Sequence, residues 1–262
     1  MTLKSLTDIL DAEIADKYVV DSSIVGLYFL VNGRGLPLNK SNARRGNFTK
    51  LEVKNAIKNS EAFTEFMTKY SNVCTVQTVI EELAIKERMM RAFVGSYGVN
   101  YYFGIPVSYK PTSYEKKMFR KIERLKQSES AIFESLKKRV LTADGRTSLN
   151  RYKSLVLVAS SNYFKGEVKN RHDEDIVASS MHYAHSTGER VAIITGDRRF
   201  VYIVENVQKH LRSSGELPDL QKLLHQDKIS IVEKREEGFE VAYCSEDFYR
   251  EPKNRVPIKT FT

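Results

Sequence analysis

Apolar residues along the chain fall into short continuous runs separated by longer stretches with helical spacing. The short runs predict strands at residues 18–20, 73–76 and 191–195, with two further strand-like runs at 229–232 and 239–243. Strands separated by helices are typical of α/β proteins with a mainly parallel central sheet. The pattern therefore predicts such a sheet, covered by helices on both faces.

Helices are predicted where apolar residues recur every three or four positions. Such segments lie at residues 3–15, 24–30, 50–70, 78–91, 113–140, from 172 onward, 199–211 and around 220–225. Residues 149–164 suit both a helix and a strand, and we favour a helix. Thr78 and Glu81 have the spacing of a capping box, in which each side chain accepts a hydrogen bond from the other's backbone amide. A helix is therefore expected to begin at Thr78.

Three acidic residues stand close to the ends of predicted strands. Asp21 ends the first strand, Glu82 opens the helix after the second, and Asp197 follows the third. In open parallel sheets, ligands bind in the crevice at the carboxyl ends of the strands. Carboxylates gathered there would repel one another unless a cation lay between them, and oxygen ligands suit a hard divalent cation. The sequence therefore predicts a site for Mg²⁺ or Mn²⁺.

Two choices among neighbouring acids follow from helical geometry. Asp173 shares a helical face with the apolar residues three and four positions later, which we expect to pack on the sheet. Asp175 lies nearly opposite around the helix, so it ranks second as a metal ligand. Glu82 is preferred to Glu81, because the proposed capping box occupies Glu81.

The balance of charge favours a polyanionic partner. The chain has 42 Lys and Arg against 33 Asp and Glu, a formal net charge of +9. Such a charge attracts nucleic acid, although it also serves solubility alone. Cys74 and Cys244 match neither a disulfide framework nor a paired zinc spacing. No apolar run reaches the ~20 residues that span a bilayer, and the N-terminus lacks a secretory signal, so we expect a soluble cytoplasmic protein without a membrane partner.

Basic residues in two places are candidate contacts to phosphate, because guanidinium groups suit phosphate oxygens. They are Lys40, Arg44 and Arg45 in the loop expected at residues 33–47, and Arg198 and Arg199 after the third strand. An exposed arginine needs no function, so this assignment has a plain alternative. The basic helix at 113–140 suits an RNA-binding face, a surface for a protein partner or a second copy, or a solvated helix, and the sequence leaves these open.

Four motifs resemble those of PIN-domain nucleases, in the family's order. Residues 18–25, YVVDSSIV, resemble its opening strand and aspartate, and residues 79–83, VIEEL, resemble its second motif, an acid followed by Leu. Residues 173–180, DEDIVASS, are similar to the third, an Asp three residues before Ile on a helix rich in small residues. Residues 193–200, IITGDRRF, resemble the fourth, a strand leading to Thr, any residue and Asp.

The resemblance implies a Rossmann-like PIN fold, with a mainly parallel central sheet flanked by helices. It covers residues 17–211, with a helical insertion around 93–170. Residues 1–16 would then be an N-terminal helical extension, and residues 212–262 a C-terminal extension with short strands.

The resemblance also implies a ribonuclease that cleaves single-stranded or structured RNA with Mg²⁺ or Mn²⁺. By position, Asp21, Glu82, Asp173 and Asp197 would be the metal ligands, Asp175 a further candidate, and Thr195 with Ser22 or Ser23 would support them. Hydrolysis would use a metal-bound water, whose pKa the cation lowers, while the cation also neutralises charge on the phosphate.

Other interpretations remain open at this point. Asp21, Asp173 and Asp197 each suit an ordinary helix N-cap. A PIN-fold RNA-binding scaffold with little activity is the main functional alternative, and DNA is a possible substrate because phosphate contacts do not separate the two nucleic acids. A phosphotransfer enzyme using Asp21 is disfavoured, because the expected second Asp is Ser23. The histidines lie in no fixed zinc-ligand motif and are left out of the site.

Overall fold

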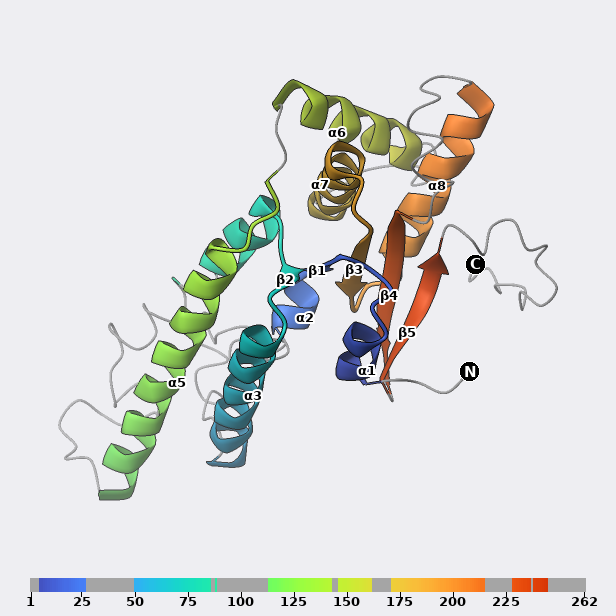
Figure 1. The fold of residues 1–262 in the computed structure, drawn as a ribbon. Helices are drawn as coiled ribbons and strands as arrows, with labels where there is room; N and C mark the ends of the chain where they lie inside the picture. The colour runs from blue at the N-terminus through green and yellow to red at the C-terminus, as the bar shows by residue number, and fades with distance from the viewer. Residues whose placement is uncertain are drawn as a thin grey trace, which may run out of the picture. The chain divides into compact units, whose positions relative to one another are not determined.

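The computed structural model describes an α/β protein whose strands are mainly parallel (Figure 1). It describes residues 5–26, 50–85, 88, 113–142, 146–161, 171–214, 228–236 and 238–244. The chain divides into two compact units. The first unit contains residues 1–17 and 143–262, and the second contains residues 18–142. The α/β class and the mainly parallel strands predicted from the sequence are thus confirmed.

The second unit holds a short parallel strand pair and long helices. Its described elements are β1 (Lys17–Val20), α2 (Ser22–Gly26), α3 (Lys50–Lys69), β2 (Val73–Cys74), a helix at residues 77–85, and α5 (Ser113–Lys137). β1 and β2 run parallel, with Tyr18 opposite Val73 and Val19 opposite Cys74. These side chains are buried, as expected for strands rich in β-branched residues.

Thr75 connects three segments of the second unit. Its hydroxyl donates a hydrogen bond to the carbonyl of Val20, 3.1 Å away. Its backbone amide donates to the carbonyl of Arg139 at 3.1 Å, and its carbonyl accepts from the amide of Leu141 at 2.8 Å. The segment that follows α5 is thereby joined to the end of β2. The carboxyl end of β1 is held by the same residue.

The helices α3 and α5 pack against each other in the second unit (Figure 1). Phe63 and Met67 of α3 are buried, as are Ile132, Phe133 and Leu136 of α5. Fully burying one such side chain stabilises a fold by roughly 1.5–3 kcal/mol. This apolar contact therefore fixes one face of α5 inside the unit.

The first unit is built on three paired strands. β3 (Val191–Thr195) pairs in parallel with β4 (Ile229–Arg235), and β4 pairs antiparallel with β5 (Gly238–Cys244). The described helices are α1 (Leu6–Asp11), α6 (Arg146–Ser161), α7 (His172–Thr187) and α8 (Arg199–Ser214). α7 contacts β3 and β4, α6 contacts α7 and α8, and α1 contacts β5. All five residues of β3 are buried, so this strand lies at the centre of the unit's core.

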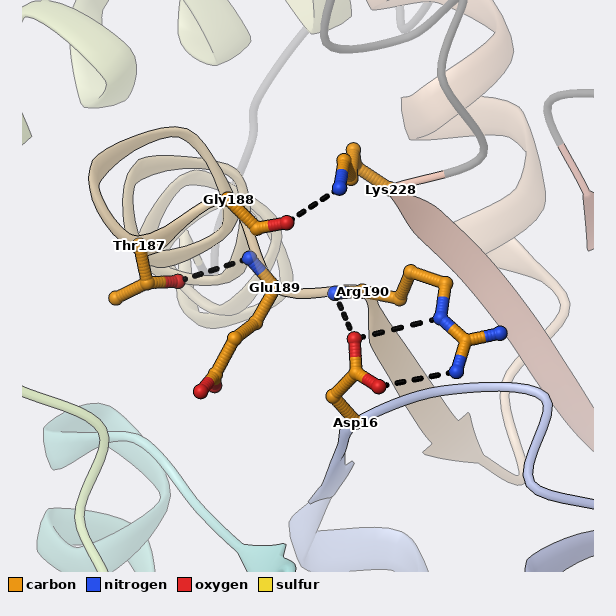
Figure 2. Close-up of polar contacts among 6 residues, drawn as sticks. All are labelled: Asp16, Thr187, Gly188, Glu189, Arg190 and Lys228. Carbon is orange, nitrogen blue, oxygen red and sulfur yellow. Dashed lines mark hydrogen bonds and ion pairs between the residues drawn. The ribbon is translucent and has the colours of Figure 1, made fainter.

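A polar network fixes the turn between α7 and β3 (Figure 2). Gly188 ends the helix with φ of 74°, a left-handed conformation that glycine adopts without steric cost. The ammonium group of Lys228 donates a hydrogen bond to the Gly188 carbonyl. Asp16 accepts hydrogen bonds from the backbone amide of Arg190 at 2.8 Å and from its guanidinium at 3.0 and 3.3 Å. The start of β3 is therefore joined to the segment that leads into β1.

Several elements match the sequence predictions, and others differ in their bounds. Residues 149–164 were expected to be helical, and α6 confirms this. The N-terminal helix is shorter than predicted, because Ser5 and Asp8 form a capping box that starts it at Leu6. The capping box proposed for Thr78 is wrong: the carbonyl of Val76 accepts from the amide of Ile80, so the helix already begins at residue 77. Thr78 therefore lies inside the first turn.

Some sequence predictions fall outside the described residues. The loop expected at 33–47, the first part of the insertion expected around 93–170 and the helix expected at 220–225 belong to this group. The expected C-terminal extension supplies β4, which pairs with β3, and β5, which pairs with β4. Among the described helices, none is both long enough and apolar enough to cross a membrane.

Candidate functional site

The turn after β3 places Asp197 at the carboxyl end of that strand. The hydroxyl oxygen of the buried Thr195 accepts a hydrogen bond from the Asp197 amide at 3.0 Å. The Asp197 carboxylate accepts a hydrogen bond through Oδ1 from the Arg199 amide at 2.9 Å, which leads the chain into α8. Asp197 itself is exposed. The predicted supporting role of Thr195 is thus consistent with its position, because its side chain orders the backbone that carries Asp197.

The three acids at the start of α7 have different surroundings. Glu174 is only 1% exposed, and its Oε1 accepts a hydrogen bond from Arg199 Nη2 at 2.6 Å. Asp173 is partly exposed, with its Oδ2 3.6 Å from Arg199 Nη1. Asp175 pairs instead with Lys153 of α6, at 3.1 Å. Asp173 and Asp175, which the sequence ranked first and second, therefore lie in separate ion pairs.

Arg199 joins the acids of α7 to the turn that carries Asp197. Its backbone amide contacts Asp197, while its guanidinium contacts Asp173 and Glu174. The sequence suggested Arg199 as a phosphate contact, but this guanidinium is directed to carboxylates of its own unit. Arg198 is exposed, with its guanidinium carbon 6.0 Å from the ring centroid of Tyr202. Lys40, Arg44 and Arg45 lie outside the described residues.

Sequence reasoning missed Glu174, although the helical pattern held a signal for it. The side chains of Val177, Ala178 and Met181 are buried, and they lie three, four and seven residues after Glu174. Residues at these separations share one helical face. The argument that selected Asp173 from its spacing to apolar residues therefore applies equally to Glu174. An acid on a buried face requires a partner, and Arg199 is that partner.

Glu233 is a second buried acid that the sequence analysis did not single out. It lies on β4 directly opposite Thr195 in the parallel register, and it is 4% exposed. Its Oε1 is 2.9 Å from Arg235 Nη1, and Arg235 also binds Glu240 on β5. Among the described residues, Glu233 Oε2 has no hydrogen-bond partner. An acid at the end of the apolar run of residues 229–232 was the available signal.

Burial raises the pKa of the Glu233 carboxyl above its usual value of 4.5. The positive charges of Arg235 and Arg198 act against this shift, whereas the negative charges of Glu240 and Asp197 add to it. The charged form is disfavoured because a buried carboxylate loses its hydration. Glu233 and Asp197 therefore interact electrostatically at the carboxyl ends of adjacent strands.

The second unit carries the other two predicted ligands. Asp21 is buried at the end of β1, and its Oδ2 accepts a hydrogen bond from the Ser23 hydroxyl at 2.5 Å. The Asp21 carbonyl accepts from the amides at the start of α2, whose first residue is the half-buried Ser22. Glu82 is half-buried on the helix at residues 77–85. Glu81 is exposed and accepts a hydrogen bond from Gln77, so its partner is not the Thr78 of the expected capping box.

The side chains predicted to hold the cation suit a hard divalent ion, because their ligand atoms are carboxylate and hydroxyl oxygens. The buried Glu233 Oε2 adds an oxygen that receives no hydrogen bond within the described part of the chain. Asp21 and Glu82 belong to the second unit, and Asp173 and Asp197 to the first. In the described ranges, no three His, Cys, Asp or Glu side chains form a group that could hold a metal ion.

Two of the histidines left out of the predicted site, both on α7, contact Tyr152 of α6. The Tyr152 hydroxyl forms a hydrogen bond with His185 Nδ1, and the ring centroids of Tyr152 and His182 are 5.4 Å apart. Burial lowers the pKa of His182, and the nearby charge of His185 lowers it further. The neutral form of the buried His182 is therefore favoured.

Comparison of the chain with protein-family models, curated proteins and solved structures gives no match. The resemblance of its four motifs to PIN-domain nucleases therefore stays a hypothesis based on residues. The structure bears on this hypothesis through the positions of the acids and of Arg199. Acids follow the ends of β1 and β3, and Arg199 joins two elements that carry them.

Proposed function

We propose that this chain is a metal-dependent ribonuclease of the PIN-domain type, with a Rossmann-like arrangement of its sheet. The observation that carries the proposal is the turn after β3, where Thr195 orders the backbone of Asp197 and Arg199 links it to Asp173. In open parallel sheets this end of a strand is where ligands bind. The four motifs in family order and the net charge of +9 support the same function.

The proposed cation is Mg²⁺ or Mn²⁺, held by carboxylates of Asp21, Glu82, Asp173 and Asp197. When bound, it would lower the pKa of a water molecule and neutralise charge on the phosphate that is attacked. The chain's own residues position the ligands. Ser23 donates to Asp21 and so orients that carboxylate, and Thr195 fixes the turn that presents Asp197.

The first experiment measures cleavage of labelled single-stranded and hairpin RNA with Mn²⁺, Mg²⁺ or EDTA. Asp197→Asn keeps the size of the side chain and removes its charge, so we expect cleavage to fall at least ~100-fold, as when one electrostatic contact to a reacting group is lost. Asp21→Asn should have the same effect. Glu61→Gln, an exposed acid on α3, is the matched control and should retain activity.

Two outcomes would contradict the nuclease proposal. One is cleavage that continues unchanged in EDTA, which would remove the need for a cation. The other is full activity in both Asp197→Asn and Asp21→Asn.

A second candidate is an RNA-binding scaffold with little or no activity. It is favoured by one observation: Arg199 already supplies positive charge to Glu174 at 2.6 Å and to Asp173 at 3.6 Å. Acids paired with a guanidinium need no cation for stability. Unchanged RNA binding in the Asp197→Asn variant, together with no cleavage by the unmodified chain, would favour the scaffold.

A further inference from the structure

Helix α5, the long helix of the second unit in Figure 1, carries a row of exposed cations, which we name the basic stripe. The stripe comprises Lys116, Lys117, Arg120, Lys121 and Arg124, and each of these residues is exposed. At 3.6 residues per turn they occupy an arc of roughly 140° on the helix surface. The buried Phe133 and Leu136, nearer the carboxyl end of α5, lie outside this arc. α5 therefore has one face packed in its unit and one face that is positively charged.

Charges within the basic stripe repel one another. Lys116 and Arg120, Arg120 and Arg124, and Lys117 and Lys121 are each four residues apart, a separation at which like charges destabilise a helix. Among the described residues, no carboxylate forms an ion pair with the stripe, although the exposed Glu123 lies beside it. Glu123, three residues after Arg120, offsets only part of this repulsion. A negatively charged ligand would offset the remainder.

Lys137, further along the same helix, is a cation whose partners lie within the chain. Its ammonium group is 2.8 Å from the carboxylate of Glu134, and it lies 4.5 Å from the ring centroid of Phe133. Lysine residues of the basic stripe have neither kind of contact among the described residues. The cation near the carboxyl end of α5 therefore has partners within the chain, whereas the lysines of the basic stripe have none among the described residues.

We infer that the basic stripe binds the phosphate backbone of single-stranded RNA. Lys116, Arg120 and Arg124 follow one another at a rise of about 6 Å along the helix axis, comparable with the separation of successive phosphates in an extended strand. A protein partner is less suitable, since protein interfaces are depleted in lysine and enriched in aromatic residues. The choice of RNA over other polyanions rests on the proposed function. The stripe itself is independent of the acids at the strand ends.

The test is fluorescence anisotropy of a labelled 12-nucleotide single-stranded RNA with the full chain, in EDTA and at several salt concentrations. The variant replaces Lys116, Arg120 and Arg124 together by Gln. The logarithm of the association constant decreases linearly with the logarithm of the salt concentration. For single strands each lost phosphate contact makes this slope shallower by about 0.7, so the triple variant should have a slope shallower by about 2. Binding at moderate salt should weaken on the order of tenfold.

A second triple variant controls for net charge. It replaces Lys58, Arg151 and Lys209, three exposed cations on α3, α6 and α8, by Gln. Both variants lower the formal charge from +9 to +6, a difference of three. We expect the control to bind RNA nearly as well as the unmodified chain. Equal weakening in the two variants, or no weakening in either, would overturn the proposal.

Folding of the stripe variant is checked directly. Glutamine forms helices nearly as well as lysine and arginine, and its introduction removes repulsion, so the melting temperature should not fall. A second variant, Lys117→Gln with Lys121→Gln, should reduce the salt slope by about 1.4. A slope that stays unchanged in this variant would also overturn the proposal.

Two further outcomes separate this inference from others. A poly-glutamate peptide should not displace the RNA, and displacement at equal charge concentration would overturn the assignment to nucleic acid. Because binding is measured in EDTA, it is independent of cleavage. Stripe-dependent binding without cleavage in Mn²⁺ would contradict only the proposed nuclease, whereas cleavage with stripe-independent binding would contradict only this inference.

Discussion

Two arginines flank β3, and each binds a carboxylate in a different environment. Arg190, just before the strand, binds Asp16 through its backbone amide and its guanidinium, and both side chains are more than 40% exposed. Arg199, just after the strand, binds Glu174, which is 1% exposed. The first pair lies in water and the second is largely removed from it. Only the second is next to the predicted site residues Asp173 and Asp197.

The difference between the two ion pairs shows that this unit buries a charged side chain after β3 and not before it. An exposed ion pair is worth little, because water screens it and the side chains lose freedom. A buried pair loses hydration, and the attraction between its partners often only offsets that loss. At the amino end of β3 the ion pair therefore serves geometry. At the carboxyl end the chain keeps the buried Glu174 paired with Arg199, although apolar residues would pack there at lower cost.

The largest expected effect on stability comes from removing the guanidinium groups of Arg199 and Arg190, each in a separate variant. Arg199→Ala leaves the Glu174 carboxylate buried without its cation, so we expect the free energy of unfolding to fall by about 3 kcal/mol. Arg190→Ala, the matched control, should cost less than ~1 kcal/mol. Urea unfolding at pH 7 measures both. Equal losses would show that the two ends of β3 do not differ in this way.

A double substitution sharpens the same point. Replacing Glu174 by Leu in the Arg199→Ala background removes the unpaired charge, so most of the lost stability should return. If the double variant is as unstable as Arg199→Ala, the loss comes from packing of the arginine stem instead of from the buried charge.

The pH dependence of Glu233 should be a smaller effect. Burial raises its pKa in the folded state, so the folded protein binds the proton more tightly than the unfolded chain does. Stability from this group is fully present below pH 4.5 and declines as pH rises through the raised pKa. The free energy of unfolding of Glu233→Gln, measured with urea at several values of pH from 4 to 8, should not show this decline. Glu236→Gln, an exposed acid in the next turn, should retain it.

Strands and long helices of this chain could be predicted because their signals are local. The apolar run at 191–195 gives a strand with the same bounds, and the apolar spacing at 50–70 gives a helix that ends one residue earlier. Helix starts were less predictable. Thr78 has the residue types of a capping box, but the Val76 carbonyl accepts the first helical hydrogen bond and moves the start.

Partners of the site residues depend on contacts between distant segments, so the sequence could not supply them. It selected Asp173 from its helical face and Asp197 from its place after a strand, and it chose Glu82 over Glu81 from a capping argument that the helix start does not support. The roles of Glu174 and Arg199 depend on the packing of α7 beside α8. Glu233 becomes notable only once β4 is paired in register with β3.

The smallest expected effect concerns the exposed pair before β3. The side-chain hydrogen bond from Arg190 is the largest cause that holds the pKa of Asp16 below its usual value of 3.8, so this carboxylate favours folding above that pH and ceases to do so as pH falls through the lowered pKa. Asp16→Asn should lower stability at pH 7 by about 0.5 kcal/mol, and the difference should vanish in acid. Urea unfolding at pH 7 and near pH 3 measures this. Asp16 and Glu233 thus make stability change with pH in opposite directions, and a decline with rising pH that depended on Asp16 would refute the contrast between the two ends of the strands.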